Sequence, residues 1–153
     1  MYWSSSNDFT EAMYYRLAQA VSFSNSFIKN ASELSGDEVN VFIAEARFLR
    51  AYAYYNLLDL YGNVPLTTEI STELPTQSNR TELFNFIESE LMEIESTLLA
   101  SNEYGRVDNI AAHALLSRLY LNAEAWTGQD RYADCITYSQ NAVSYTHLRA
   151  HET

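Results

Sequence analysis

The chain has 153 residues, enough for one hydrophobic core, and 47% of them are apolar, with only four glycines and two prolines. This composition is typical of an all-helical globular unit and not of a disordered segment. A net charge of −11 argues against binding to nucleic acid, which needs a basic stripe, and no run of about eighteen apolar residues could span a membrane.

The first half of the chain predicts two long helices. A helix is expected over 8–34, because Asp8 and Glu11 fit a capping box and apolar residues then recur at helical spacing. Gly36 would end it. A second helix over 37–62 would turn back along the first and form an antiparallel hairpin.

The second predicted helix has apolar residues on two faces. Asp37 or Ser35 would cap its start, and Gly62 followed by Pro65 would end it. Its main apolar stripe is Phe42, Ala46, Leu49, Ala53, Leu57 and Leu60, and its second face is Phe48, Tyr52 and Tyr55. A helix with two apolar faces is expected to lie between neighbours in a bundle.

Two arginines of this helix have no local acidic partner. Arg47 and Arg50 lie three residues apart, and no Asp or Glu stands three or four residues from either. An unpaired guanidinium is costly to bury. We therefore expect at least one of them to contact a carboxylate on another helix; binding of a ligand by the pair is the alternative.

The second half of the chain predicts three further helices after an irregular segment rich in Thr and Ser. They are expected over 81–99, over 109–126 with Asp108 as the N-cap, and over 130–142. The acids between Glu82 and Glu95 are expected to form a solvated helix face. Together the five helices predict an all-α, irregular tetratricopeptide-like array of helical hairpins.

Two segments resemble the landmarks of one family. The sequence AEARFLRAYAYYNLLDLYGNVPLTTE, at 44–69, resembles the signature of the SusD/RagB family, the nutrient-capture lipoproteins of Bacteroidetes outer membranes. The sequence GRVDNIAAHALLSRLYL, at 105–121, resembles that family's second landmark, a Gly-Arg turn followed by an alanine-rich helix. The signature positions carried over to this chain are Glu45, Arg47, Arg50, Tyr61, Gly62, Pro65, Gly105 and Arg106. Asp108 departs from the small hydroxyl residue that the family more often has there, but Asp caps a helix equally well.

The resemblance implies a SusD-like amino-terminal helical fragment of a surface-exposed outer-membrane lipoprotein. Such a protein captures glycans or other nutrients without catalysis and delivers them to a SusC-like TonB-dependent transporter. Residues 1–8 lack an export signal, so the lipid anchor, the expected membrane contact, would lie before this chain. A soluble tetratricopeptide-like adaptor that binds peptides is the alternative, and a small glycosidase is a third reading.

The candidate ligand-binding residues precede the first helix. Tyr2, Trp3 and Asn7 combine aromatic rings with an amide, and sugars present apolar faces and hydroxylated edges to such groups. The resemblance points to the same region. The alternative is a frayed terminus in which Trp3 merely packs.

No cofactor, metal or catalytic set is expected. Cys135 is the only cysteine, the glycines are isolated, and His113 is expected to pack between helices. The segment 143–153 resembles the translation of a sequencing adaptor, so we expect the native helical domain to be 1–142 and assign no zinc site to the two histidines of that segment.

Overall fold

The computed structural model describes residues 7–150. This part of the chain folds into six α-helices and contains no β-strand, only an isolated bridge between Pro65 and Gln77. The expected all-α architecture is therefore confirmed. None of these helices is long and apolar enough to cross a membrane. Their bounds are α1 Asp8–Ala31, α2 Asp37–Tyr61, α3 Arg80–Ile94, α4 Asn109–Leu121, α5 Ala123–Thr127 and α6 Tyr132–Ala150.

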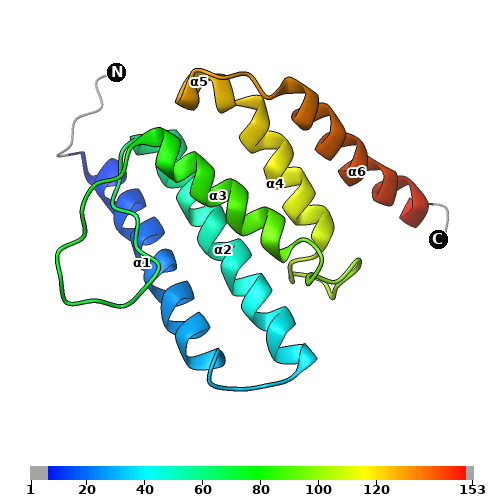
Figure 1. The fold of residues 1–153 in the computed structure, drawn as a ribbon, viewed down its shortest axis with the longest axis horizontal. Helices are drawn as coiled ribbons and strands as arrows, with labels where there is room; N and C mark the ends of the chain where they lie inside the picture. The colour runs from blue at the N-terminus through cyan, green and yellow to red at the C-terminus, as the bar shows by residue number, and fades with distance from the viewer. Residues whose placement is uncertain (1–6, 151–153) are drawn as a thin grey trace.

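The long helices form an array in chain order, from α1 at one edge of the molecule to α6 at the other (Figure 1). α2 packs against α1 on one side and α3 on the other, and α4 packs against α6. The short α5 joins α4 to α6 and contacts α3. Successive long helices run in opposite directions (Figure 1), as expected for a series of helical hairpins.

The core lies between α2, α3 and α4. Apolar residues of α3 recur every three or four positions, which places them on one buried stripe. The largest fully buried side chains are Tyr54, Leu58, Leu83, Ile87, Leu91, Ile94, Leu116, Leu119 and Tyr120. Since α3 supplies four of these, it is the central packing element of the array.

The main apolar stripe expected on α2 is only partly buried, contrary to the expectation from its spacing. Leu49 is 52% exposed and Leu60 is 56% exposed, whereas Ala46, Ala53 and Leu57 are buried. The reason is that α2 turns a different stripe towards α3. The buried residues of that stripe include Ala44, Phe48, Ala51, Tyr54, Tyr55 and Leu58, so of the expected second face only Tyr52 remains substantially exposed.

Two of the expected helix caps are also wrong. The cap of α1 is Asn7 and not Asp8, because Asn7 Oδ1 accepts hydrogen bonds from the backbone N–H groups of Phe9 and Thr10 at 3.1 and 3.3 Å. The N-cap of α2 is Gly36, with no side-chain cap. Asp108 caps α4 as expected, since its Oδ1 accepts from the backbone N–H of Ala111 at 3.0 Å.

The later helices differ from the expected ranges at their ends. α3 stops at Ile94, whose carbonyl accepts the backbone N–H groups of both Thr97 and Leu98 in a closing turn. The single helix expected over 109–126 is divided at Asn122, where the Asn122 amide donates to the carbonyl of Arg118 at 3.0 Å. The Asn122 side chain therefore satisfies a carbonyl of the last turn of α4, and α5 begins at the next residue.

Residue 142 is not marked by a break, because α6 continues to Ala150. We nevertheless expect deletion of 143–153 to change the free energy of unfolding by less than about 0.5 kcal/mol, as for a surface change. Val143 is half exposed and Ser144 is exposed, so these two residues contribute little buried surface. Urea unfolding of the two chain lengths would test this, and a clear loss of stability would show that the segment belongs to the domain.

Candidate functional site

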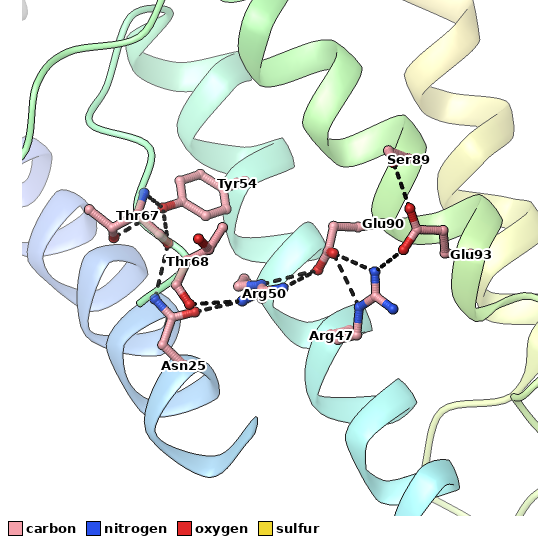
Figure 2. Close-up of polar contacts among 9 residues, drawn as sticks. All are labelled: Asn25, Arg47, Arg50, Tyr54, Thr67, Thr68, Ser89, Glu90 and Glu93. Carbon is pink, nitrogen blue, oxygen red and sulfur yellow. Dashed lines mark hydrogen bonds and ion pairs between the residues drawn. The ribbon is translucent and has the colours of Figure 1, made fainter. Parts of the chain in front are cut away.

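The most strongly buried polar cluster is centred on Arg50 of α2 (Figure 2). Its Nε and Nη2 atoms donate to Glu90 Oε2 of α3 at 3.1 and 2.5 Å, and its Nη1 atom donates to Asn25 Oδ1 of α1 at 2.8 Å. All three side chains are buried, with 4% to 7% of each residue exposed. This Arg50 cluster therefore connects three helices through charged and polar groups that are shielded from solvent.

Arg47 uses the other oxygen of the same carboxylate. Its Nε and Nη2 atoms donate to Glu90 Oε1 at 3.1 and 2.6 Å, and Nη2 also donates to Glu93 Oε2 at 2.6 Å. Burial opposes the charge of Arg47, but the hydrogen bonds with the two glutamates outweigh it and raise the Arg47 pKa. The expectation that an arginine of this pair contacts a carboxylate on another helix is confirmed for both.

The same cluster holds the irregular segment between α2 and α3. The Asn25 amide donates to the carbonyl of Thr67 at 3.0 Å, and Arg50 Nη1 donates to that of Thr68 at 3.4 Å. The Tyr54 hydroxyl accepts the backbone N–H of Thr67 at 2.7 Å and donates to its carbonyl at 3.0 Å. Figure 2 shows these groups converging on Thr67 and Thr68, directly before the exposed stretch that begins at Thr68. Side chains of α1 and α2 thus fix the course of this connection.

A second clamp brings the two sequence landmarks together. Arg106 Nη2 donates to Glu45 Oε1 of α2 at 2.9 Å, and the Asn102 amide donates to the same oxygen at 2.6 Å. The guanidinium of Arg106 also stacks over the ring of Phe42, 4.9 Å from its centre. Gly105, with φ of +86°, makes the turn that aims Arg106 at α2. The signature glutamate and the Gly-Arg turn are therefore partners in the fold.

The remaining signature residues shape the end of α2. The Tyr61 hydroxyl donates to the carbonyl of Thr10 at 2.7 Å and so ties this end to the start of α1. Gly62 leaves the helix with φ of +76°, and Pro65 then forms the isolated bridge to Gln77. These three residues direct the chain into the segment that the Arg50 cluster holds.

Gly62→Ala is expected to lower the free energy of unfolding by about 1–3 kcal/mol, because an L residue is strained at this positive φ. A Cβ atom here would also lie 2.7 Å from Nε of Arg80. The Arg80 side chain can move away, so crowding should account for only a small part of the lost stability. Adding Arg80→Ala to Gly62→Ala should therefore recover only that small part. Urea unfolding of the two single variants and the double variant would separate strain from crowding; full recovery in the double variant would contradict the strain argument.

Glu90 corrects the expectation of a fully solvated acidic face on α3. Glu82 and Glu93 are exposed as expected, but Glu90 is 7% exposed. A sequence signal for this exists, because Glu90 stands three residues after Ile87 and four before Ile94, within the buried stripe. Asn25 stands four residues after buried Val21 in the same way. The backbone carbonyls that complete the cluster carry no such signal.

Of the candidate ligand-binding residues, Tyr2 and Trp3 lie outside the described residues. Asn7 caps α1, next to a hollow of about 400 Å³ between the start of α1 and the end of α2. The hollow is mainly apolar and is lined by Phe9, Thr10, Met13, Leu60 and Tyr61. Its exposed Phe9 ring offers an aromatic surface within one helical turn of Asn7.

The described residues contain no group of three or more His, Cys, Asp and Glu side chains placed to hold a metal ion. His113 is buried, and its Nε2 atom lies 2.8 Å from Glu95 Oε1. The Tyr120 hydroxyl donates to Glu88 Oε1 at 2.8 Å, and burial together with this carboxylate raises the Tyr120 pKa. These polar groups connect helices to one another, as the Arg50 cluster does.

The chain is similar in sequence to proteins of one known family. Residues 2–121 match the SusD-like family model described as starch-binding and associating with the outer membrane. The starch-binding protein SusD of Bacteroides thetaiotaomicron is 37% identical over 143 residues, which cover 92% of this chain and 26% of that protein. This chain therefore spans about a quarter of the length of that relative.

Solved structures share the fold. A SusD-like protein from Bacteroides fragilis superposes with a TM-score of 0.80 at 25% identity, over 93% of this chain and 28% of that one. A second structure, described as containing a xylogluco-oligosaccharide, superposes with a TM-score of 0.83 at 23% identity, over 92% of this chain and 30% of that one. On the family match and on the landmarks that the fold brings together, this chain belongs to the SusD-like family.

Proposed function

We propose that the chain is the helical part of a protein that captures glycans at the surface of the outer membrane and does not turn them over. The observation that carries this is the similarity to a starch-binding relative over 92% of the chain. The likeness to a structure containing a xylogluco-oligosaccharide agrees with it. We further propose that the captured glycan is delivered to a SusC-like TonB-dependent transporter and that a lipid anchor holds the protein at the membrane.

The local chemistry supports stacking and neutral hydrogen bonds as the mode of binding. The hollow beside Asn7 has an apolar lining with exposed Phe9, and the candidate residues Tyr2 and Trp3 stand seven and six residues before Phe9 in sequence. Sugar rings bury their apolar faces on aromatic side chains and satisfy their hydroxyls with amides and hydroxyl groups. By contrast, Arg47, Arg50 and Arg106 are committed to glutamates of the fold. Binding should therefore depend little on ion pairs.

The experiment uses the complete gene product, recovered with its flanking DNA. Calorimetric titration with maltoheptaose, xyloglucan oligosaccharides and a neutral peptide as control should show binding of at least one glycan and none of the peptide. Chromatography of each glycan after long incubation should show no shortened product. Binding of peptides alone would favour the adaptor reading, and turnover of any glycan would overturn the non-catalytic assignment.

A further inference from the structure

A polar hollow of about 230 Å³ lies between the start of α3 and the link from α5 to α6. Its lining consists of Thr81, Phe84, Asn85, Thr127, Gln129 and Arg131. Successive long helices run in opposite directions, so the start of α1, the end of α2, the start of α3 and this link all lie at one end of the array (Figure 1). The polar hollow is therefore at the same end of the molecule as the apolar hollow beside Asn7.

The lining of the polar hollow keeps hydrogen-bonding groups available. Thr81 and Asn85 stand four residues apart on one face of α3, and both are exposed. Neither their side chains nor the exposed side chain of Gln129 form a hydrogen bond with another described residue. The link itself is fixed, because the Thr127 hydroxyl accepts the backbone N–H of Gln129 at 3.2 Å. Amides and hydroxyls both donate and accept, so this set suits a ligand with several hydroxyl groups.

Arg131 favours a neutral ligand over an anion. Its Nε atom donates to Asp134 Oδ2 at 2.5 Å and its Nη2 atom to Glu88 Oε1 at 2.8 Å, while the guanidinium stacks over the Tyr120 ring, 4.6 Å from its centre. Two carboxylates therefore balance its charge, in a chain whose net charge is −11, so an anion would be repelled. The Nη1 atom of Arg131 has no partner among the described residues and can donate to a hydroxyl.

The two hollows are joined by residues that touch one another. Tyr61 lines the hollow beside Asn7 and Thr81 lines the polar hollow. Their neighbours in sequence, Gly62 and Arg80, lie in contact, since a Cβ atom at Gly62 would be 2.7 Å from Nε of the exposed Arg80. Neighbouring helix axes lie about 8–10 Å apart, so hollows separated by two such spacings are about 20 Å from each other. One sugar ring cannot reach both hollows, whereas a chain of several rings can.

We propose that the polar hollow is a second binding site for a neutral glycan and takes one sugar unit of a chain that also occupies the hollow beside Asn7. This rests on the proposed function, which assigns the hollow beside Asn7 to the glycan. Pockets for drug-sized ligands have volumes of about 300–1,000 Å³, so the smaller polar hollow suits a single ring. Because a chain held in one hollow has a high effective concentration at the other, the protein should prefer long neutral glycans to short or acidic ones.

Removal of the free amides tests this. The double variant Asn85→Ala with Gln129→Ala removes them from the polar hollow, and the control Gln19→Ala with Gln140→Ala removes two exposed amides that line neither hollow. The complete gene product is titrated calorimetrically with maltotriose and a short xyloglucan oligosaccharide. Its affinity for long chains is measured by electrophoresis in gels that contain amylose, xyloglucan or polygalacturonate.

The double variant should bind amylose or xyloglucan about tenfold more weakly than the parent and bind the matching short chain equally well. The control should match the parent throughout, and all proteins should share one melting temperature because the substituted side chains are exposed. Equal affinity of the double variant and the parent for the long chains would overturn the proposal and leave the proposed function intact. An equal loss for short and long chains would also overturn it, since the polar hollow would then belong to the first site. Stronger binding of polygalacturonate than of the neutral polymers would refute the neutral ligand class, whereas a parent that binds no glycan would contradict the proposed function itself.

Discussion

Glu90→Gln is expected to lower the free energy of unfolding by about 3–5 kcal/mol, because it removes the carboxylate from a buried ion pair and leaves the Arg50 guanidinium without its countercharge. The new amide still offers one oxygen but cannot serve both arginines. Urea unfolding monitored by circular dichroism would measure the loss. At this size the effect is a large fraction of the total stability of a small domain, so low temperature is needed for a folded baseline.

Glu93→Gln is the matched control. Glu93 lies on the same helix one turn later and also contacts Arg47, but its side chain is 60% exposed. Exposed pairs contribute little, so we expect a loss of about 0.5 kcal/mol. The hydrogen bond from Arg47 lowers the pKa of Glu93, so this small contribution is present above the ordinary carboxyl pKa and disappears as the pH falls through the lowered value. Equal losses in the two variants would refute the special role of Glu90.

Replacing both Arg50 and Glu90 by apolar residues distinguishes the net contribution of the ion pair to stability from the cost of leaving one buried charge unpaired. In the double variant Arg50→Met with Glu90→Leu, no buried charge remains in the Arg50 cluster, although Arg47 keeps Glu93. We expect it to be more stable than Glu90→Gln alone, because replacing a buried pair by apolar groups is often neutral. Amide exchange at Thr67, whose N–H donates to the Tyr54 hydroxyl, should nevertheless increase, since the next carbonyl, that of Thr68, loses the Arg50 donor that holds the segment.

The positions of the long helices, and the need of the two arginines for carboxylate partners, could be predicted from the sequence. Apolar spacing located every long helix, and the lack of any acid near Arg47 and Arg50 required a carboxylate from elsewhere in the fold. Which glutamate supplies this carboxylate could not be read from the sequence, because several acids lie between Glu82 and Glu95 and all of them suit a surface helix. Only the position of Glu90 within the apolar stripe of α3 distinguishes it.

Which face of α2 is buried, which residue caps α1 and how Thr67 and Thr68 are anchored depend on tertiary contacts and local backbone geometry, which the spacing of residue types does not reveal. Leu49 and Leu60 share the spacing of buried Ala53 and Leu57, but periodicity shows that a stripe is apolar and not which neighbour covers it. Asn7 caps α1 in place of Asp8, and both residues are good caps, so the choice rests on backbone geometry at the entry to the helix. The anchoring of Thr67 and Thr68 uses backbone carbonyls, which every residue has.

Trp3→Ala is expected to weaken glycan binding by the complete gene product about tenfold or more, because a central aromatic anchor commonly carries over 1.4 kcal/mol of binding free energy. Trp3 follows Tyr2 and stands four residues before Asn7, which the structure places beside the apolar hollow with exposed Phe9. A sugar ring stacked on the indole would have its hydroxyls within reach of such polar neighbours.

Two measurements distinguish a binding role from a packing role for Trp3. If Trp3 stacks on a sugar, the melting temperature of Trp3→Ala should equal that of the parent while the dissociation constant rises, and added salt should change neither dissociation constant appreciably, because stacking involves no ion pair. If Trp3 only packs, the melting temperature should fall with affinity unchanged. Tyr104→Ala is the control, since Tyr104 is fully exposed in the turn before α4, far in sequence from the candidate site. Equal affinity of Trp3→Ala and parent across the glycan panel would remove Trp3 from the site and leave Phe9 as the next aromatic residue to substitute.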